Sequence, residues 1–189
     1  NVFTTDNGDY LRLGDIIRLT KNDPAVNALG NRNFALLGDP SLKLNYPSQN
    51  VEVTSITNNN EESDTINAES VVTISGQIQN NGVVNSSFNG TIFSTVYDKE
   101  SSFTTLGNEN SPFNYYAKQN VIFRGKSSVI NGQFTVEFIV PKNISYQIDL
   151  GKISFYAVNQ EETIDAGGAR YVFVGGSANS PINDGTGPD

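Results

Sequence analysis

Short runs in which apolar and polar residues alternate dominate this chain from Val51 onward. The clearest run is residues 134–140, where Phe and Val side chains alternate with Thr and Glu until Pro141 ends the pattern. Successive side chains of a strand point to opposite faces, so this period of two predicts a strand with one buried face. Comparable runs lie at residues 51–57, 72–78, 91–97, 121–123, 126–130, 152–158 and 170–174. About seven or eight such strands predict an immunoglobulin-like antiparallel β-sandwich over residues 48–175.

Glycine and asparagine residues indicate where these strands turn or approach one another. Asn81-Gly82 and Asn131-Gly132 favour the two-residue turns of β-hairpins, because both turn positions need positive φ. Gly76 predicts a bulge or a close approach by another part of the chain. Residues 91–97 are apolar on both faces, which predicts a strand in the centre of a sheet. Residues 98–117 lack periodic apolar positions and predict a long irregular loop.

The first 47 residues have a different pattern, which predicts a small α/β segment. Leu13, Ile16, Ile17 and Thr20 recur at i, i+3, i+4 and i+7, which predicts a helix over about residues 9–21 with Asp9 as its N-cap. Two short strands are expected within about residues 33–46. One helix and two short strands cannot bury their apolar faces alone, so we expect this segment to end a preceding domain or to pack on the β-sandwich. Its exposed apolar faces would also favour self-association through residues 1–47.

Two further segments are interpreted as connections. Gly38-Asp39-Pro40 lies between the two short strands and predicts a tight structural turn rather than a functional loop. Glycine tolerates positive φ, aspartate bonds its own backbone and proline fixes φ, so each residue favours a turn for its own reason. Residues 176–189 are rich in Gly, Ser, Asn and Asp, and they predict a flexible linker.

The chain contains no Cys and no His, which removes most of the side chains that catalyse reactions at neutral pH. Cysteine nucleophiles, Ser-His-Asp relays and zinc sites built from His or Cys are excluded. A carboxylate pair, a Lys or Tyr base, or a metal site with oxygen ligands remains open. We therefore predict that this chain is not an enzyme and that it uses no cofactor.

The charge balance argues against nucleic acid as a partner. The chain has 20 acidic and 12 basic residues, for a net charge of -8, and the phosphate backbone repels such a surface. No apolar stretch approaches the ~20 residues of a membrane-spanning helix, and no signal peptide is recognisable. Asn, Ser, Thr, Gly and Gln dominate the polar residues, as is common in secreted bacterial domains. We therefore expect an extracellular location.

Three acidic clusters are candidate sites, and each is interpreted as a solvated turn. They are Asp6–Asp9, Glu61–Asp64 and Glu161–Asp165. The first cluster lacks the distal bidentate Glu of a calcium-binding loop. The other two contain carboxylates that are close in sequence on expected turns, and such groups are seldom tuned by burial for catalysis.

Two motifs suggest chemistry at the surface. Asp64-Thr65-Ile66 resembles the O-glycosylation acceptors of the Bacteroidota, which makes Thr65 a candidate for modification in an exposed loop. Phe113, Tyr115 and Tyr116 form an aromatic cluster in the expected long loop, where they could stack on sugar rings. A carbohydrate-binding β-sandwich is therefore an alternative function, although the chain contains no Trp.

Several segments occur in an order that resembles a known family. Residues 13–22 read LGDIIRLTKN and residues 33–44 read NFALLGDPSLKL. These two are similar to the last helix and the closing strands of the catalytic domain in gingipain-type cysteine peptidases. Residues 88–99, 123–126, 131–134 and 151–157 are similar to the sandwich next to that catalytic domain, most closely in the PorU-like cell-surface proteases (sortases) of type IX secretion.

The resemblance implies a role without catalysis. In this family the catalytic His and Cys lie upstream of these segments, so no catalytic position is carried over to this chain. Residues 1–47 would be the remnant of a catalytic domain, and the whole chain would be a structural and docking module. The parent would be a sortase-like protease at the bacterial cell surface that processes the C-terminal sorting domains of secreted cargo.

The resemblance also implies partners. These are the upstream catalytic domain of the same parent and an outer-membrane barrel protein of the secretion system. The same module of a secreted, protein-degrading gingipain-like peptidase is the alternative.

Overall fold

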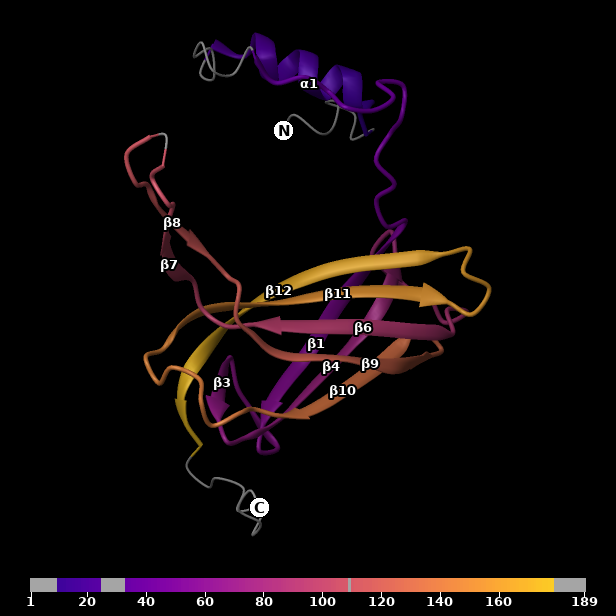
Figure 1. Ribbon diagram of the computed structural model, residues 1–189. Helices are drawn as coiled ribbons and strands as arrows, with labels where there is room; N and C mark the ends of the chain where they lie inside the picture. The colour runs from indigo at the N-terminus through magenta and orange to yellow at the C-terminus, as the bar shows by residue number, and fades with distance from the viewer. Residues whose placement is uncertain (1–9, 25–32, 109, 179–189) are drawn as a thin grey trace, which may run out of the picture. The chain divides into compact units, whose positions relative to one another are not determined.

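The structure, a computed structural model, describes residues 10–24, 33–108 and 110–178. The chain divides into an N-terminal unit, residues 1–46, and a β-domain, residues 47–189, and each is described by itself. Strands dominate the described residues, which contain one α-helix, α1 (Leu13–Asn22) (Figure 1). The prediction of a mainly β chain is therefore confirmed. The described part of the chain contains no helix long and apolar enough to cross a membrane.

Helix α1 starts later than the sequence predicted, at Leu13 instead of near residue 9. Its N-cap is Arg12, whose side chain makes no capping hydrogen bond. The predicted cap, Asp9, lies outside the described residues. No residue of α1 is buried, so the apolar stripe that predicted this helix has no core to pack against within the described residues.

Residues 33–46 form no strand, contrary to the prediction. They make a single isolated antiparallel β-bridge, between Arg12 and Lys43. A strand must satisfy its backbone groups with a neighbouring strand, and the described residues of this unit provide none. One backbone carbonyl of this segment accepts a hydrogen bond from the first residue of α1 instead: the N–H of Leu13 donates to the oxygen of Leu42 at 2.8 Å.

The described residues of the β-domain form twelve strands. The longer ones are β1 (Gln49–Asn58), β4 (Val71–Asn80), β6 (Gly90–Tyr97), β9 (Val121–Ile130), β10 (Gln133–Ile139), β11 (Asp149–Asn159) and β12 (Asp165–Ser177). The shorter ones are β2 (Glu61–Glu62), β3 (Thr65–Ala68), β5 (Val83–Val84), β7 (Ser101–Thr104) and β8 (Asn114–Ala117).

The seven longer strands form one closed sheet in the order β1-β12-β11-β6-β9-β10-β4, and β4 pairs with β1 to complete the ring (Figure 1). The β1–β12 pairing is parallel, and the other pairings in the ring are antiparallel. Two seams are short. Their paired residues are Gln49–Ala166 and Asn50–Gly167 in the β1–β12 seam, and Ile130–Gln133 and Val129–Phe134 in the β9–β10 seam. The expected sandwich would have two separate sheets, whereas these seams join the strands into one ring.

The inner face of the ring carries the core, as the alternation predicted. Buried side chains there come from every strand of the ring and from β3 and the segment before β6. They include Ile66, Val72, Ile74, Ile78, Phe88, Ile92, Val96, Val129, Ile153 and Val174. Burial of this set excludes apolar surface from water and supplies the main drive for folding of the β-domain.

Gly76 confirms the predicted close approach. The ring of Phe134 lies over it, and a Cβ atom at Gly76 would be 2.4 Å from the Cζ atom of Phe134 and 2.5 Å from the carbonyl oxygen of Glu52. Strand β1 is irregular opposite this site, between Val53 and Ser55. A glycine therefore makes room for an aromatic ring at the centre of the core.

Both predicted hairpin turns are confirmed. Asn81 and Gly82 connect β4 to β5 with φ values of 50° and 80°, and Asn131 and Gly132 connect β9 to β10 with 52° and 74°. Positive φ at both positions matches the right-handed twist of the paired strands, and this explains the Asn-Gly dipeptides.

Two predicted connections differ from the structure. Residues 98–117 are not an irregular loop throughout, because β7 and β8 pair there as a separate two-stranded sheet. Figure 1 shows this hairpin extending away from the ring. The predicted linker begins too early, since β12 continues to Ser177 and residues 179–189 lie outside the described residues.

A buried ion pair connects three segments at the end of β6. The Nζ atom of Lys99 donates to the Oδ1 atom of Asp98 at 2.9 Å, to the carbonyl oxygen of Ser145 at 2.9 Å and to that of Val174 at 3.3 Å. Both charged residues are more than nine-tenths buried. All three ammonium protons thus have acceptors, and this lysine joins β6, β12 and the loop before β11.

Candidate docking surface

Strands β9, β6, β11 and β12 are neighbours in the ring, and the side of them that faces away from the core is called here the outer face. Phe93 on β6 is paired with Lys126 on β9 and with Tyr156 on β11, so the three side chains share this face. The rings of Phe93 and Tyr156 are stacked with their centroids 6.5 Å apart. They are 45% and 43% exposed, so both rings are available to a ligand.

The next row of the outer face consists of smaller side chains with a cation at one end. Thr95 is paired with Arg124 on β9 and with Ser154 on β11, and Ser154 is paired with Ala169 on β12. Arg124 is exposed. Hydroxyl groups and a guanidinium therefore lie beside the Phe93–Tyr156 pair.

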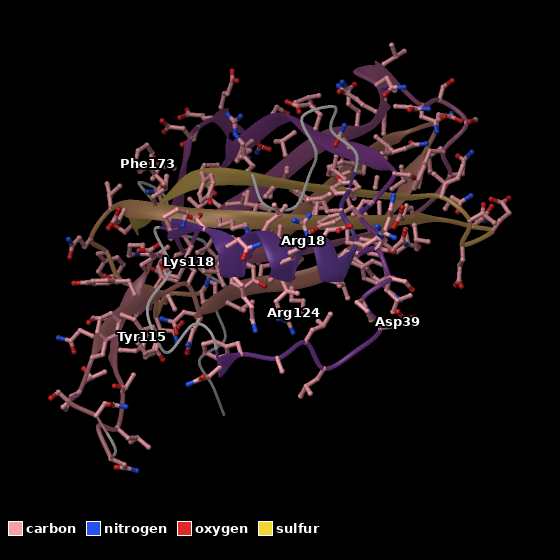
Figure 2. The ribbon with its side chains drawn as sticks, turned by 90° about the horizontal axis from the view of Figure 1, so that it is seen from above. Arg18, Asp39, Tyr115, Lys118, Arg124 and Phe173 are labelled. Atoms are coloured by element: carbon pink, nitrogen blue, oxygen red, sulfur yellow. The ribbon has the colours of Figure 1, made fainter. Side chains whose placement is uncertain are left out.

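A second aromatic row lies beyond it. Lys152 on β11 is paired with Tyr97 on β6 and with Tyr171 on β12, and Leu150 is paired with Phe173. Tyr171 is 59% exposed and Phe173 is 42% exposed. Figure 2 labels Arg124 on β9 and Phe173 on β12, the first and last of these four neighbouring strands. The outer face thus has two rows of rings separated by a row of small polar side chains.

Charge differs between two groups of strands in the ring. One group is β9, β6, β11 and β12, and the other is β1, β4 and β10. Arg124, Lys126 and Lys152 make no ion pair with any residue that the structure describes. The carboxylates of the same four strands stand only at their first residues, as Asp149 and Asp165. In the other half, β1, β4 and β10 contain two acidic residues and no basic residue. A positive face on a chain with a net charge of -8 favours ligands that are negatively charged.

The turn Gly38-Asp39-Pro40 belongs to the N-terminal unit. The Oδ1 atom of Asp39 accepts a hydrogen bond from the N–H of Ser41 at 2.8 Å. This backbone bond, with a further one from the Ser41 side chain, lowers the pKa of Asp39 from its usual value. The N–H of Gly14 donates to the oxygen of Pro40 at 3.0 Å, so this turn supports the start of α1.

Thr65, the candidate for O-glycosylation, lies on strand β3 and not in the exposed loop that the sequence predicted. The reason is its neighbour Ile66, which is fully buried and draws the segment against β12. Thr65 itself is half-buried, and its Oγ1 atom donates to the Oδ1 atom of Asp64 at 3.0 Å. Modification of Thr65 stays a prediction.

The acidic clusters do not converge on a site within the described residues. Glu61 and Glu62 are exposed on β2. Glu161 accepts a hydrogen bond from the side chain of Asn159 at 2.8 Å, and Asp165 accepts one from the N–H of Ser48 at 2.9 Å. Residues 6–9 lie outside the described residues. In the part that is described, no group of acidic side chains is placed to hold a metal ion.

The aromatic cluster that the sequence singled out lies in the β7–β8 hairpin. Tyr115 stacks on Phe103 with the ring centroids 5.6 Å apart, while Phe113 and Tyr116 are 67% and 70% exposed. At the base of the hairpin, the Nζ atom of Lys118 donates to the carbonyl oxygen of Leu150 at 2.9 Å. The cluster is therefore exposed but has no cation of its own comparable to those of the outer face.

Sequence reasoning missed the outer face, although one signal for it was present. Residues 91–97 are apolar on both faces, and the structure confirms the predicted central position of this strand, between β11 and β9. A central strand with two apolar faces is normally covered on both sides. Here Phe93 is exposed on the outer side, which indicates a surface that another molecule or domain covers.

The described strands form a mainly β domain whose outer face exposes aromatic and basic side chains. No protein-family model matches this chain, and no curated protein sequence matches it. Among solved structures, the chain is similar to the dimeric latent PorU from Porphyromonas gingivalis, with 27% sequence identity and a TM-score of 0.62. This similarity covers 96% of this chain and 18% of the PorU chain, so it includes the N-terminal unit as well as the β-domain.

A second solved structure is less similar. The sporulation control protein Spo0M from Bacillus subtilis has 14% identity and a TM-score of 0.41, over 69% of this chain and 50% of that protein. That level is too low to support an inference. The PorU comparison supports a PorU-like relation for this chain, which spans less than a fifth of the PorU chain.

Proposed function

We propose that this chain is a non-catalytic structural and docking part of a PorU-like cysteine protease of type IX secretion, located at the bacterial cell surface. The observation that carries this proposal is the similarity to PorU over 96% of the chain, which extends through both units. Many unrelated functions share β-rich folds, so a shared fold alone would be weak support. Here the match covers both the small N-terminal unit and the β-domain of this chain.

The chemistry of the sequence supports a role without catalysis. A cysteine protease needs a thiolate and a base to activate it, and this chain contains neither Cys nor His. The parent's activity would therefore reside in residues outside this sequence. In the proposed parent, this part would stabilise the catalytic domain and position it for the processing of secreted cargo.

Exposed apolar side chains in the N-terminal unit support the inference that another domain packs on this unit. Phe34, Leu37 and Leu42 are 68%, 97% and 56% exposed, and α1 buries no residue. Apolar side chains with so little cover are expected where a neighbouring domain normally packs. We infer that the upstream catalytic domain of the parent covers them and that an outer-membrane barrel protein is a further partner. In isolation the same side chains would favour self-association through residues 1–47, which sedimentation of the chain with and without these residues would test.

We also infer that the ring is an immunoglobulin-like sandwich whose two sheets are joined at their corners. One sheet would contain β1, β4 and β10, and the other β9, β6, β11 and β12. The two seams between these groups have two residue pairs each, whereas β11 and β12 are paired from Asp149 to Val158. An experimental structure with long, continuous pairing across both seams would contradict this inference.

The proposal predicts the size of the native protein. Antibodies against the β-domain should detect, in cells that make this chain, a protein several times larger than the 20.5 kDa of the chain itself. Mass spectrometry of that protein should find peptides upstream of residue 1 that contain His and Cys. A native product of 20.5 kDa, with no upstream peptides, would contradict the proposal. A C-terminal sorting domain in the native protein would indicate a secreted gingipain-like peptidase in place of a sortase.

A further inference from the structure

We propose that Asn81 is a site of spontaneous deamidation, in which the backbone nitrogen of Gly82 attacks the side-chain amide of Asn81. The modification would add a negative charge to the turn between β4 and β5, and its only co-reactant would be water. The proposal rests on the folded β-domain alone, so it can succeed or fail independently of the proposed relation to PorU.

The reaction would proceed through a cyclic imide. The nitrogen of Gly82 forms a bond to the Cγ atom of Asn81, while the bond from Cγ to the side-chain nitrogen breaks. Ammonia leaves with the proton that the Gly82 nitrogen loses, and a succinimide ring remains. Water then opens the ring. Cleavage of the bond from Cγ to the Gly82 nitrogen gives aspartate, and cleavage of the bond from the main-chain carbonyl carbon to that nitrogen gives isoaspartate.

The described residues contain three Asn-Gly dipeptides, Asn81-Gly82, Asn89-Gly90 and Asn131-Gly132. A fourth, Asn7-Gly8, lies outside them. Glycine favours the reaction because it has no side chain to hinder its nitrogen and because its backbone adopts many conformations. The three described dipeptides are therefore alike in sequence, and only their surroundings in the fold distinguish them.

The attacking nitrogen is accessible at Asn81-Gly82. Both residues are exposed. Neither the side chain of Asn81 nor the N–H of Gly82 has a hydrogen-bond partner among the described residues. A Cβ atom placed on Gly82 would meet no described atom from another part of the chain within 4 Å. Water and a base dissolved in it can therefore reach this nitrogen.

The turn that contains Asn81 can also open at low cost. The turn must change its backbone angles before the Gly82 nitrogen reaches Cγ, since both residues have positive φ in the folded chain. Strand β5 follows the turn, and its two residues, Val83 and Val84, are 70% and 36% exposed. The ladder between β4 and β5 has two residue pairs. Short elements with little buried surface open locally far more often than the core of a domain.

The turn at Asn131-Gly132 is held closed. The N–H of Gly132 donates to the carbonyl oxygen of Phe88 at 2.8 Å, and the N–H of Ile78 donates to the carbonyl oxygen of Gly132 at 2.7 Å. Gly132 is buried, and a Cβ atom placed on it would lie 2.3 Å from the carbonyl oxygen of Asn85. Attack by this nitrogen requires both hydrogen bonds to break in a packed site, so we expect the reaction to be slow.

Asn89-Gly90 is held in a different way. The Oδ1 atom of Asn89 accepts a hydrogen bond from the N–H of Asn131 at 2.9 Å, which fixes the side chain that would be attacked. Gly90 begins β6 and is paired on one side with β9 and on the other with β11. The nitrogen of Gly90 therefore cannot move toward Asn89 unless the sheet opens at this end.

The test incubates the folded full chain at mildly alkaline pH and follows each site by peptide mass spectrometry. Replacement of the amide nitrogen by oxygen raises the peptide mass, and electron-transfer fragmentation distinguishes aspartate from isoaspartate. We expect Asn81 to react at least about tenfold faster than Asn89 or Asn131, because each hydrogen bond that must break lowers the population of the open site. Both aspartate and isoaspartate should form at Asn81.

Two controls assign the difference to the fold. In a denaturing concentration of urea, the three sites should react at rates within about threefold of one another, because the surroundings that distinguish them are lost. Asn81→Gln should abolish the fast reaction, since its longer side chain would have to form a larger ring. The matched variant Asn131→Gln should leave the fast reaction unchanged.

Two results would overturn the proposal. The first is reaction of Asn89 or Asn131 in the folded chain as fast as that of Asn81. The second is an Asn81 that stays intact in the folded chain after the same residue has reacted in urea, which would show that the β4–β5 turn protects it.

Discussion

Replacement of Lys99 by Met should lower the free energy of unfolding by about 3–5 kcal/mol, as expected when one partner of a buried ion pair is removed. The substitution leaves the Asp98 carboxylate without its cation in a site where the residue is 7% exposed. It also removes the donor to the carbonyl oxygens of Ser145 and Val174. Urea unfolding monitored by circular dichroism measures the change.

Two controls make the result specific to the pair. Lys142→Met removes a lysine whose side chain is 77% exposed and 3.9 Å from Glu69, so its effect should stay below about 1 kcal/mol. The double variant Asp98→Asn with Lys99→Met should recover part of the loss, because no uncompensated charge stays buried. A Lys99→Met variant as stable as the unmutated chain would show that this ion pair does not hold the three segments together.

Phe134→Ala should destabilise the β-domain by a similar amount, about 3–5 kcal/mol. Phe134 is 3% exposed and lies against Phe155, with ring centroids 5.7 Å apart. Its removal leaves a cavity where the two halves of the core meet. As a control, Ile139→Ala on the same strand should change stability by no more than about 0.5 kcal/mol, because Ile139 is 62% exposed.

Gly76 provides a sharper test of the same packing. Gly76→Ala should destabilise by about 1–3 kcal/mol, because the new methyl group would overlap Phe134 and the carbonyl of Glu52. In a Phe134→Ala background the first overlap disappears, so the cost of Gly76→Ala should fall. Costs that add within about 0.5 kcal/mol would show that the glycine does not serve the aromatic ring.

The strands of the β-domain could be predicted because their signal is local. Each run alternates along its own sequence, and the Asn-Gly turns specify their φ values through two residues. The closed ring could not be predicted in the same way. It depends on Gln49 meeting Ala166 and on Ile130 meeting Gln133, and the first of these pairs joins residues that are distant in sequence. No local pattern specifies which sheet edges meet.

Local patterns also failed where a segment had no buried face. Strands β7 and β8 consist of exposed or half-buried residues, so they lack the apolar alternation that indicates a strand. Residues 33–46 show the opposite case. Their apolar residues predicted strands, but in the described residues Leu37 is 97% exposed and the segment has no neighbouring strand. An apolar run predicts burial only where other elements cover it.

The candidate docking surface required the pairing register before it could be recognised. Phe93, Arg124 and Tyr156 come from three strands and are far apart in sequence. The aromatic cluster that was visible in the sequence, at residues 113–116, lies instead on a separate hairpin. In the sequence, the only indication was that the central strand β6 has apolar residues on both faces. That indication could be interpreted only once the residues of the neighbouring strands on the same face were known.

The most direct test of the proposed function compares proteolysis by this chain with proteolysis by the longer parent protein that the proposal predicts. Both would be incubated with an unfolded protein substrate, with and without a thiol-alkylating reagent. We predict no cleavage by the chain and cleavage by the longer protein that alkylation abolishes, because Cys and His are absent from this sequence. Cleavage by the purified chain alone, or a longer protein that is inactive in every processed form, would contradict the account.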